Sequence, residues 1–225
     1  MGHPWDAVSL DVGGVLVVPH HDVLARTLDD VGATYDRSRF GPGHYLAMAA
    51  CDRAASDPDD FTDYLWAFVG AVGIPEDQAT AAHDALLEVL LTPVWRQPVA
   101  GSREGLAALA AGGHRLAVTS NSDGTVADLL LEHEWVQVGH GPGVVVEVIT
   151  DSGIVGVSKP DPVVFAATVD ALGLPPDRVL HVGDSVHYDV EGARASGLQS
   201  IHFDPYQLCQ SDDHDHITRL SELLR

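Results

Sequence analysis

The spacing of apolar residues along this chain changes repeatedly between short uninterrupted runs and a helical period of about 3.6 residues. Five apolar runs have the length of buried strands, at residues 7–18, 115–119, 144–149, 178–182 and 199–203. Segments with helical spacing lie between most of these runs, at residues 102–111, 122–134, 161–172 and 187–195. Strands that alternate with helices predict an α/β fold with a parallel sheet and right-handed crossovers.

The stretch between the first two expected strands differs because its pattern is helical throughout and shows no convincing alternation of period two. Helices are expected there at residues 22–31, 60–69 and 75–91. Pro93 and Pro98 then bracket a linker that returns to the α/β pattern. The sequence therefore predicts two parts, a core made of residues 1–18 and 95–225 and a helical insert made of residues 19–94.

Three segments near or beyond the last elements follow neither pattern clearly. Residues 135–143 contain Gly-His-Gly-Pro-Gly and are interpreted as a loop or a small hairpin. Residues 217–224 are expected to close the chain as a short helix. The acidic and histidine-rich tract at residues 212–216 is interpreted as solvated surface without a role of its own.

Composition and charge restrict the classes of partner. The chain has 225 residues, of which 45% are apolar, and this is enough to build a substantial core. Because 12 Lys and Arg face 33 Asp and Glu, the net charge of −21 repels nucleic acid and anionic membrane surfaces, and we expect neither as a partner. No apolar run has the length needed to span a bilayer. The same charge repels phosphorylated ligands, so a phosphate site here requires a local lysine and a divalent cation.

The two cysteines carry little information. Cys51 and Cys209 are far apart in the sequence and form neither a metal-binding spacing nor a disulfide framework. The first residues lack the basic, apolar and cleavage regions of a signal peptide. A reducing, cytoplasmic environment is therefore the expectation.

One carboxylate, Asp11, interrupts the first apolar run and is followed at once by Gly13 and Gly14. In an open parallel sheet, ligands bind where the strands end, and glycines allow the backbone to turn and approach a ligand closely. This stretch alone is equally consistent with a catalytic acid and with a strand-capping aspartate in an ordinary turn.

Polar residues also follow the later strands. Ser120 and Asn121 come after the strand at residues 115–119, where a hydroxyl and backbone amides suit a phosphoryl oxygen, although both residue types are ordinary helix caps. Lys159 stands immediately before Pro160 and is either the cation that a phosphate site needs or a solvated surface charge.

Two further carboxylates follow the strand at residues 178–182. Asp184 comes at the end of that strand and Asp189 five residues later, so both can reach a cation above Asp11. Mg²⁺ takes a few hard oxygen ligands and keeps several waters, and these carboxylates with a backbone carbonyl suffice for it. The alternative for Asp189 is a favourable position near a helix N-terminus.

Four short motifs carry a family resemblance: D-V-G-G-V-L, T-S-N, S-K-P-D-P-V-V-F and V-G-D-S-V-H-Y-D. Their order and spacing across the core resemble those of the haloacid dehalogenase-like (HAD) superfamily, in the subgroup with a helical (C1-type) cap after the first motif. The resemblance implies a Rossmann-like parallel sheet core and an inserted α-helical cap at residues 19–94.

The resemblance also implies an activity and the residues that carry it. Asp11 would be the nucleophile that takes the phosphoryl group, Ser120 its hydrogen-bond partner, and Lys159 the charge that binds nucleophile and phosphate. The implied phosphate-binding residues are Ser120, Asn121 and Lys159. The implied Mg²⁺ ligands are Asp11, the Gly13 carbonyl, Asp184 and Asp189, the last directly or through water. The expected function is a Mg²⁺-dependent phosphatase that acts on a small phosphorylated metabolite through an aspartyl-phosphate.

Gly13 departs from the family pattern, because most phosphatases of the family have there a second Asp that protonates the leaving oxygen. Three alternatives follow. The first is a phosphatase in which water, His20 or His21 replaces that acid, although the two histidines are equally consistent with a solvated hinge. The second is a 2-haloacid dehalogenase, disfavoured because the pair of Asp184 and Asp189 is typical of a metal site. The third is a catalytically impaired protein that binds ligands or regulates.

Overall fold

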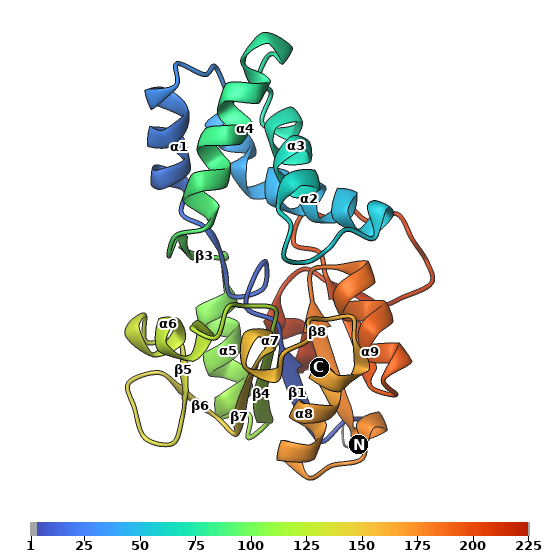
Figure 1. Cartoon of the computed structure of the whole chain (residues 1–225). Helices are drawn as coiled ribbons and strands as arrows, with labels where there is room; N and C mark the ends of the chain where they lie inside the picture. Colours follow the sequence, from blue (N-terminus) through green and yellow to red (C-terminus); the bar gives the residue numbers. More distant parts are fainter. Residues whose placement is uncertain (1–3, 225) are drawn as a thin grey trace. The chain divides into compact units, whose positions relative to one another are not determined.

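The structure is a computed structural model that describes residues 4–224, and these residues divide into two compact units. One unit contains the described residues up to Leu16 and those from Val99 onward. The other unit is Val17–Pro98. Figure 1 shows the α/β layer of the first unit and the helices α1 to α4 of the second. We describe each unit by itself.

The first unit is built on a six-stranded sheet in the order β10-β9-β8-β1-β4-β7, and every neighbouring pair is parallel. The strands are β1 (Ala7–Leu10), β4 (Arg115–Ser120), β7 (Val148–Asp151), β8 (Val179–Gly183), β9 (Gln199–Phe203) and β10 (His216–Ile217). The predicted α/β parallel fold is therefore confirmed. In the register, Leu10 pairs with both Val118 and Val182, so three strands end at the same edge of the sheet.

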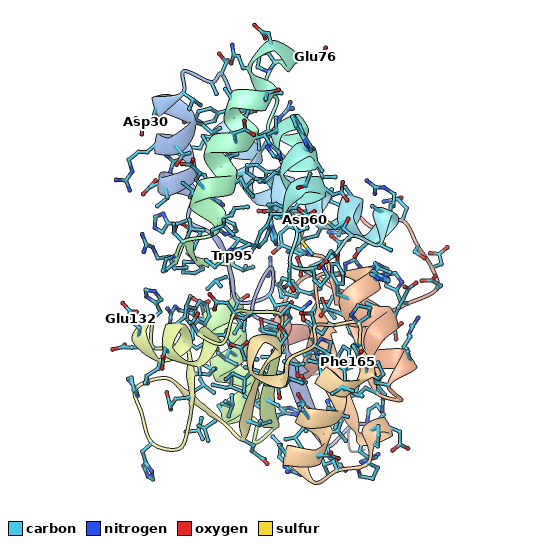
Figure 2. All side chains as sticks on the ribbon, in the orientation of Figure 1. Asp30, Asp60, Glu76, Trp95, Glu132 and Phe165 are labelled. Atoms are coloured by element: carbon cyan, nitrogen blue, oxygen red, sulfur yellow. The ribbon has the colours of Figure 1, made fainter. Side chains whose placement is uncertain are left out.

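The helices and turns of this unit connect the strands in the expected rhythm. They are α5 (Ser102–Ala111), α6 (Val126–Glu132), α7 (Ser152–Val155), α8 (Pro162–Leu172), η2 (Pro176–Arg178), η3 (Val186–Glu191), α9 (Gly192–Ala195) and η4 (Leu220–Leu224). The Asp161 carboxylate caps α8 by accepting a hydrogen bond from the Val163 amide at 2.9 Å, and Pro162 occupies the first turn. Both features are typical of the start of a helix. Phe165 of α8, labelled in Figure 2, is fully buried on the sheet among Ala7, Ala117 and other apolar residues.

Several local predictions in this unit are wrong, because strand pairing that the local pattern does not encode decides the structure of these segments. The expected strand at 144–149 is two strands, β6 (Val144–Val146) and β7. The expected loop or hairpin at 135–143 contains β5 (Val136–Val138), which pairs in parallel with β6 beside the buried Trp135. A hairpin pairs its strands antiparallel, so this segment is not one.

The C-terminal predictions also need correction. The short helix expected at residues 217–224 is present only as the 3₁₀ helix η4 (Leu220–Leu224), because Ile217 belongs to the edge strand β10. The tract at residues 212–216 is not wholly solvated, because His214 is only 7% exposed. Pairing of His216 and Ile217 with His202 and Phe203 of β9 draws this tract onto the sheet, which its polar composition did not indicate.

The second unit is the inserted helical region, with α1 (His21–Asp30), η1 (Arg37–Arg39), α2 (Phe40–Ala54), α3 (Thr62–Ala71) and α4 (Glu76–Leu90). Its two ends are short strands, β2 (Val17–Pro19) and β3 (Trp95–Pro98), which pair antiparallel. The first expected strand, at residues 7–18, is therefore two strands, β1 and β2, and the sequence pattern did not predict β3. Tyr64 and Phe68 are buried and stack at 6.1 Å, whereas Trp66 is 44% exposed. Trp95, labelled in Figure 2, adds its ring to the same cluster at 6.4 Å from Tyr64.

Within residues 4–224, no helix combines the length and the apolar character that crossing a bilayer requires.

Candidate active site

Asp11 follows β1 directly and lies at the sheet edge where β1, β4 and β8 end together. Its backbone amide donates to the Val182 carbonyl at 2.9 Å, which extends the β1–β8 ladder by one residue. The residue is 9% exposed, and one carboxylate oxygen accepts from the Val12 amide at 2.7 Å. The strand ladder therefore holds this carboxylate in one place at the edge where α/β proteins bind ligands.

Lys159 is the only lysine in the sequence, and the structure buries it beside Asp11. Its Nζ lies 3.0 Å from Asp11 Oδ1 and 2.6 Å from Asp189 Oδ1. The Asn121 side chain holds its backbone on both sides, accepting from the Lys159 amide at 2.7 Å and donating to the Lys159 carbonyl at 3.1 Å. A buried ammonium is strongly unfavourable without carboxylate partners, so Lys159 belongs to this cluster and is not a surface charge.

Asp189 is placed by a distorted helical turn. In η3 the Val190 amide donates to the Ser185 carbonyl at 3.2 Å, the i→i+5 bond of a π-helical turn, a feature often found at functional sites. Asp189 Oδ1 accepts from Lys159, and Oδ2 accepts from the Ser185 amide at 3.1 Å. A Cβ on Gly183 would lie 2.0 Å from Asp189 Cγ, so this approach requires glycine.

Asp184 depends on a second glycine, Gly14. Gly14 has a φ of +67°, and a Cβ at this position would lie 1.9 Å from Asp184 Oδ2. Both the backbone angle and the space therefore require glycine. Asp11, Asp184 and Asp189 are all buried, and one oxygen from each lies within 4.8 Å of the others. Gly13 is partly exposed in the turn after Asp11.

The electrostatics of this cluster are unbalanced, with three buried carboxylates around one ammonium. Burial raises the pKa of Asp11 to about 6, even though Lys159 acts to lower it. Burial also acts to raise the pKa of Asp189. The Lys159 charge and a hydrogen bond from His181 nevertheless hold the pKa of Asp189 below its usual range. A divalent cation would balance the remaining negative charge, and the all-oxygen donor set suits Mg²⁺. The residues of the cluster therefore fit Mg²⁺.

The structure brings the predicted phosphate-binding residues to the same edge. Ser120 is buried at the end of β4, and its hydroxyl makes one long bond, at 3.4 Å, to the Asn121 carbonyl. The Asn121 side chain is already hydrogen-bonded to the backbone amide and carbonyl of Lys159. Asn121 thus positions Lys159, while contact of Ser120 and Asn121 with phosphate stays a prediction.

His181 is a site residue that the sequence interpretation missed. It is fully buried in the middle of β8, its Nε2 bonds Asp189 Oδ1 at 3.0 Å, and its Nδ1 bonds the Ser9 hydroxyl at 3.1 Å. The Ser9 hydroxyl is hydrogen-bonded to the Thr119 hydroxyl, which in turn is hydrogen-bonded to the Thr168 hydroxyl, at 2.7 Å in each case. The available signal was a polar residue inside each of three apolar strands, which indicates a buried hydrogen-bond network.

The two histidines proposed as replacement acids belong to the other unit. His20 caps α1, because its Nδ1 accepts from the Asp22 amide at 3.3 Å. His21 lies edge-on to the Phe40 ring at 5.6 Å. These contacts give each histidine a local structural role, and a role in proton transfer stays a prediction.

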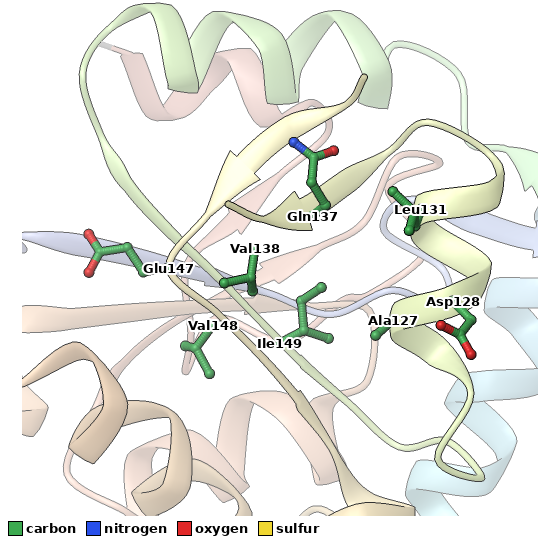
Figure 3. Close-up of a pocket in the computed structure, with 8 residues that line it drawn as sticks. All are labelled: Ala127, Asp128, Leu131, Gln137, Val138, Glu147, Val148 and Ile149. Carbon is green, nitrogen blue, oxygen red and sulfur yellow. The ribbon is translucent and has the colours of Figure 1, made fainter. Parts of the chain in front are cut away.

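A hollow of about 410 Å³ lies elsewhere in the first unit, between α6 and the strands β5 and β7 (Figure 3). Among the described residues, its lining contains two acids, Asp128 and Glu147, and no lysine, histidine or cysteine. Glu147 is held by Arg115 at 2.6 Å in an exposed ion pair. The hollow therefore lacks the groups that phosphoryl transfer requires, and the carboxylate cluster is the candidate active site.

Comparison with known proteins identifies the family of the chain. A sequence model of the haloacid dehalogenase-like hydrolases matches residues 5–197. Haloacid dehalogenase-like hydrolase domain-containing protein 3 of Mus musculus is 33% identical over 130 residues, 57% of this chain and 49% of that protein. Phosphoserine phosphatase of Thermus thermophilus is 42% identical over 53 residues, 24% of this chain and 21% of that enzyme. The chain thus spans about half or less of the curated relatives it matches.

Among solved structures, the HAD-hydrolase YfnB from Bacillus subtilis, bound to magnesium, superposes with a TM-score of 0.63. The match covers 97% of this chain and 96% of that chain at 16% identity. At this identity the likeness supports the fold alone.

Proposed function

Because the chain belongs to the haloacid dehalogenase-like hydrolase family, we propose that it is a Mg²⁺-dependent phosphatase for a small phosphorylated metabolite. The reaction proceeds through an aspartyl-phosphate on Asp11. The observation that carries this proposal is the contact of the buried Asp11 carboxylate with the buried Lys159 ammonium at 3.0 Å. This pair offers an anionic nucleophile and a fixed cation at one point, which phosphoryl transfer to a carboxylate requires.

The metal site follows from the same cluster. Asp11, Asp184 and the Gly13 carbonyl would hold Mg²⁺, with Asp189 acting through water because both of its oxygens already accept hydrogen bonds. The magnesium reported with YfnB supports this choice of ion. Bound Mg²⁺ supplies positive charge that reduces the repulsion between a carboxylate and a phosphate dianion.

The chain's own residues divide the reaction into two displacements. An Asp11 oxygen attacks phosphorus, the bond from phosphorus to the ester oxygen breaks, and the alcohol leaves after taking a proton from solvent. Water then attacks the phosphorus of the aspartyl-phosphate, which releases inorganic phosphate and regenerates Asp11. Throughout, Lys159 offsets the charge on the transferring group, while Asp189 and Asn121 hold Lys159 in position.

A substrate screen tests the proposal. Metal-stripped protein is assayed against aryl, acyl and sugar phosphates and against 2-haloacids, with and without added Mg²⁺. We expect phosphate release that requires Mg²⁺ and no halide release. Halide release without metal would show that the chain is a 2-haloacid dehalogenase instead. Intact protein that binds Mg²⁺ but hydrolyses no ester would show that it is a ligand-binding or regulatory protein without this activity.

Removal of the fixed cation gives a prediction for Lys159. Lys159→Ala is expected to lower the rate of phosphate release by ~10²–10³-fold at saturating Mg²⁺, because a preorganised charge at the reacting group is lost. The measurement is kcat and KM on p-nitrophenyl phosphate. Arg115→Ala is the matched control, since this cation pairs with Glu147 at the surface and its loss should leave the rate unchanged. An unchanged rate in Lys159→Ala would contradict the proposed role.

The raised pKa of Asp11 gives a pH prediction. Because burial raises the pKa of this ligand to about 6, protons compete with Mg²⁺ below that pH, and affinity falls as pH falls. With one proton displaced, Mg²⁺ is expected to bind about tenfold more weakly at pH 5 than at pH 7. Titration calorimetry at the two pH values measures the difference. Equal affinities would show that Asp11 stays ionised and is not titrated in this range.

A further inference from the structure

A second cluster of metal-binding side chains lies in the first unit, formed by residues far apart in the sequence. His202 comes from β9, His216 from β10, and Cys209 and His214 from the segment between these strands. One ligand atom from each of the four lies within 4.8 Å of the others. Three imidazoles and one thiol are the ligand types of structural zinc sites, and such sites use four protein ligands.

We propose that His202, Cys209, His214 and His216 form a tetrahedral Zn²⁺ site that fastens the segment between β9 and β10 to the sheet. The site contains none of the residues assigned to phosphoryl transfer. It shares no ligand with the Mg²⁺ cluster, although His202 bonds the backbone carbonyl of Asp184.

Two of the six distances between ligand atoms have the lengths that a tetrahedral site gives, and the other four lie within 4.8 Å. With bonds of ~2.05 Å to nitrogen and ~2.3 Å to sulfur, tetrahedral Zn²⁺ separates two nitrogens by about 3.3 Å and nitrogen from sulfur by about 3.6 Å. His214 Nε2 lies 3.2 Å from His202 Nδ1 and 3.7 Å from Cys209 Sγ. These two edges match the tetrahedral values within about 0.1 Å.

The hydrogen bonds outside the cluster direct lone pairs toward its centre. His202 Nε2 donates to the Asp184 carbonyl at 3.1 Å, and His214 Nδ1 donates to the Asp213 carboxylate. In neutral imidazoles this leaves His202 Nδ1 and His214 Nε2 without protons, and these two nitrogens face each other. Two facing lone pairs repel unless a cation lies between them. A carboxylate or carbonyl behind each ligating histidine is the usual outer shell of a metal site.

His216 provides an independent observation. Its Nε2 is buried and has no hydrogen-bond partner in the structure. Burial of a polar atom without a partner is unfavourable, and a Zn²⁺ ion bound by this cluster would give this nitrogen a partner. Burial also lowers the pKa of His202, which favours the neutral imidazole that metal binding requires.

Spectroscopy with Co²⁺ tests the site in the full chain without a histidine tag. Reduced, metal-stripped protein should bind one Co²⁺ with a thiolate charge-transfer band and the strong visible bands of tetrahedral Co²⁺, both displaced by Zn²⁺. Co²⁺ among the oxygen ligands of Asp11, Asp184 and Asp189 gives no thiolate band. Absence of the band in the wild type would overturn the proposal.

Matched cysteine variants locate the bound ion. Cys209→Ser should abolish the thiolate band and weaken Zn²⁺ binding at least ~100-fold, whereas Cys51→Ser, which changes the other cysteine, should change neither. Zn²⁺ should also raise the unfolding temperature of the wild type and of Cys51→Ser but not of Cys209→Ser. A thiolate band that persists in Cys209→Ser would contradict the site.

A substitution outside the four ligands separates a built site from a chance cluster. Asp213→Asn keeps all four ligands but removes the charge behind His214, so Zn²⁺ affinity should fall ~10–100-fold while the Co²⁺ spectrum persists. Asp212→Asn, at the exposed neighbouring position, is the control and should leave the affinity unchanged. Equal affinities in the two variants would show that Asp213 does not support a metal ligand, against the proposal.

Discussion

Asp11→Asn is expected to lower the rate of phosphate-ester hydrolysis by a factor on the order of 10⁴ or more, because an amide oxygen is a poor nucleophile. The fold should persist. The side chains have nearly the same shape, and the carboxylate that is removed has a pKa already raised to about 6 by burial, so a neutral group is tolerated there. Lys159 retains Asp189 as a partner at 2.6 Å.

The measurement is single-turnover and steady-state phosphate release, with circular dichroism to confirm the fold. Asp128→Asn is the control, since Asp128 is an exposed carboxylate in the hollow beside α6 and has no place in the reaction. Trapping of a phosphorylated protein in the wild type, and its loss in Asp11→Asn, would identify the intermediate directly. A variant that hydrolyses esters at the wild-type rate would end the covalent mechanism.

The second large effect concerns the leaving group. With glycine at position 13, the residue two places after the nucleophile supplies no proton to the departing oxygen, and general acid catalysis is typically worth ~10²–10⁴ in rate. The wild type should therefore hydrolyse aryl and acyl phosphates faster than alkyl phosphates by a factor of this order. A Brønsted plot of kcat/KM against leaving-group pKa measures the dependence.

Two variants at the same position test the cause. Gly13→Asp should raise the rate on alkyl phosphates selectively and flatten the plot, whereas Gly13→Asn has a similar size and no acidic proton and should not. Mg²⁺ affinity is measured for both, because a change of backbone angle at this turn would weaken metal binding in both variants alike. Fast wild-type hydrolysis of a sugar phosphate would show that another group donates the proton, and His20 and His21 would be replaced next.

The periodic part of the fold was predictable from sequence because it rests on local patterns. Helices α5 and α8 begin and end within one residue of the expected positions, since apolar spacing and, for α8, the Asp161 cap are local properties. The strands β3 and β5 were missed, and β2 was not separated from β1, for the opposite reason. Each is three or four residues long and exists only through its pairing with a partner strand, which carries no local signal.

Within the candidate active site, the motifs identified residues but not their contacts. The position of Lys159 in the sequence favoured a surface charge, but the structure shows it between Asp11 and Asp189. Gly14, rather than Gly13, proves to be the glycine whose lack of a side chain makes room for Asp184. Two of these contacts, Lys159 with Asp11 and Gly14 with Asp184, join segments more than a hundred residues apart, which no periodicity encodes.

The sequence by itself determined the α/β class, the helical insert and the order of the motif residues, because apolar spacing and strand ends can be recognised within short segments of sequence. Only the tertiary structure decided that His181 supports Asp189 and that His202, Cys209, His214 and His216 converge. The physical reason is that a ligand set is defined by directions and distances of a few ångströms. Strand pairing between β9 and β10, and not proximity along the chain, brings those atoms together.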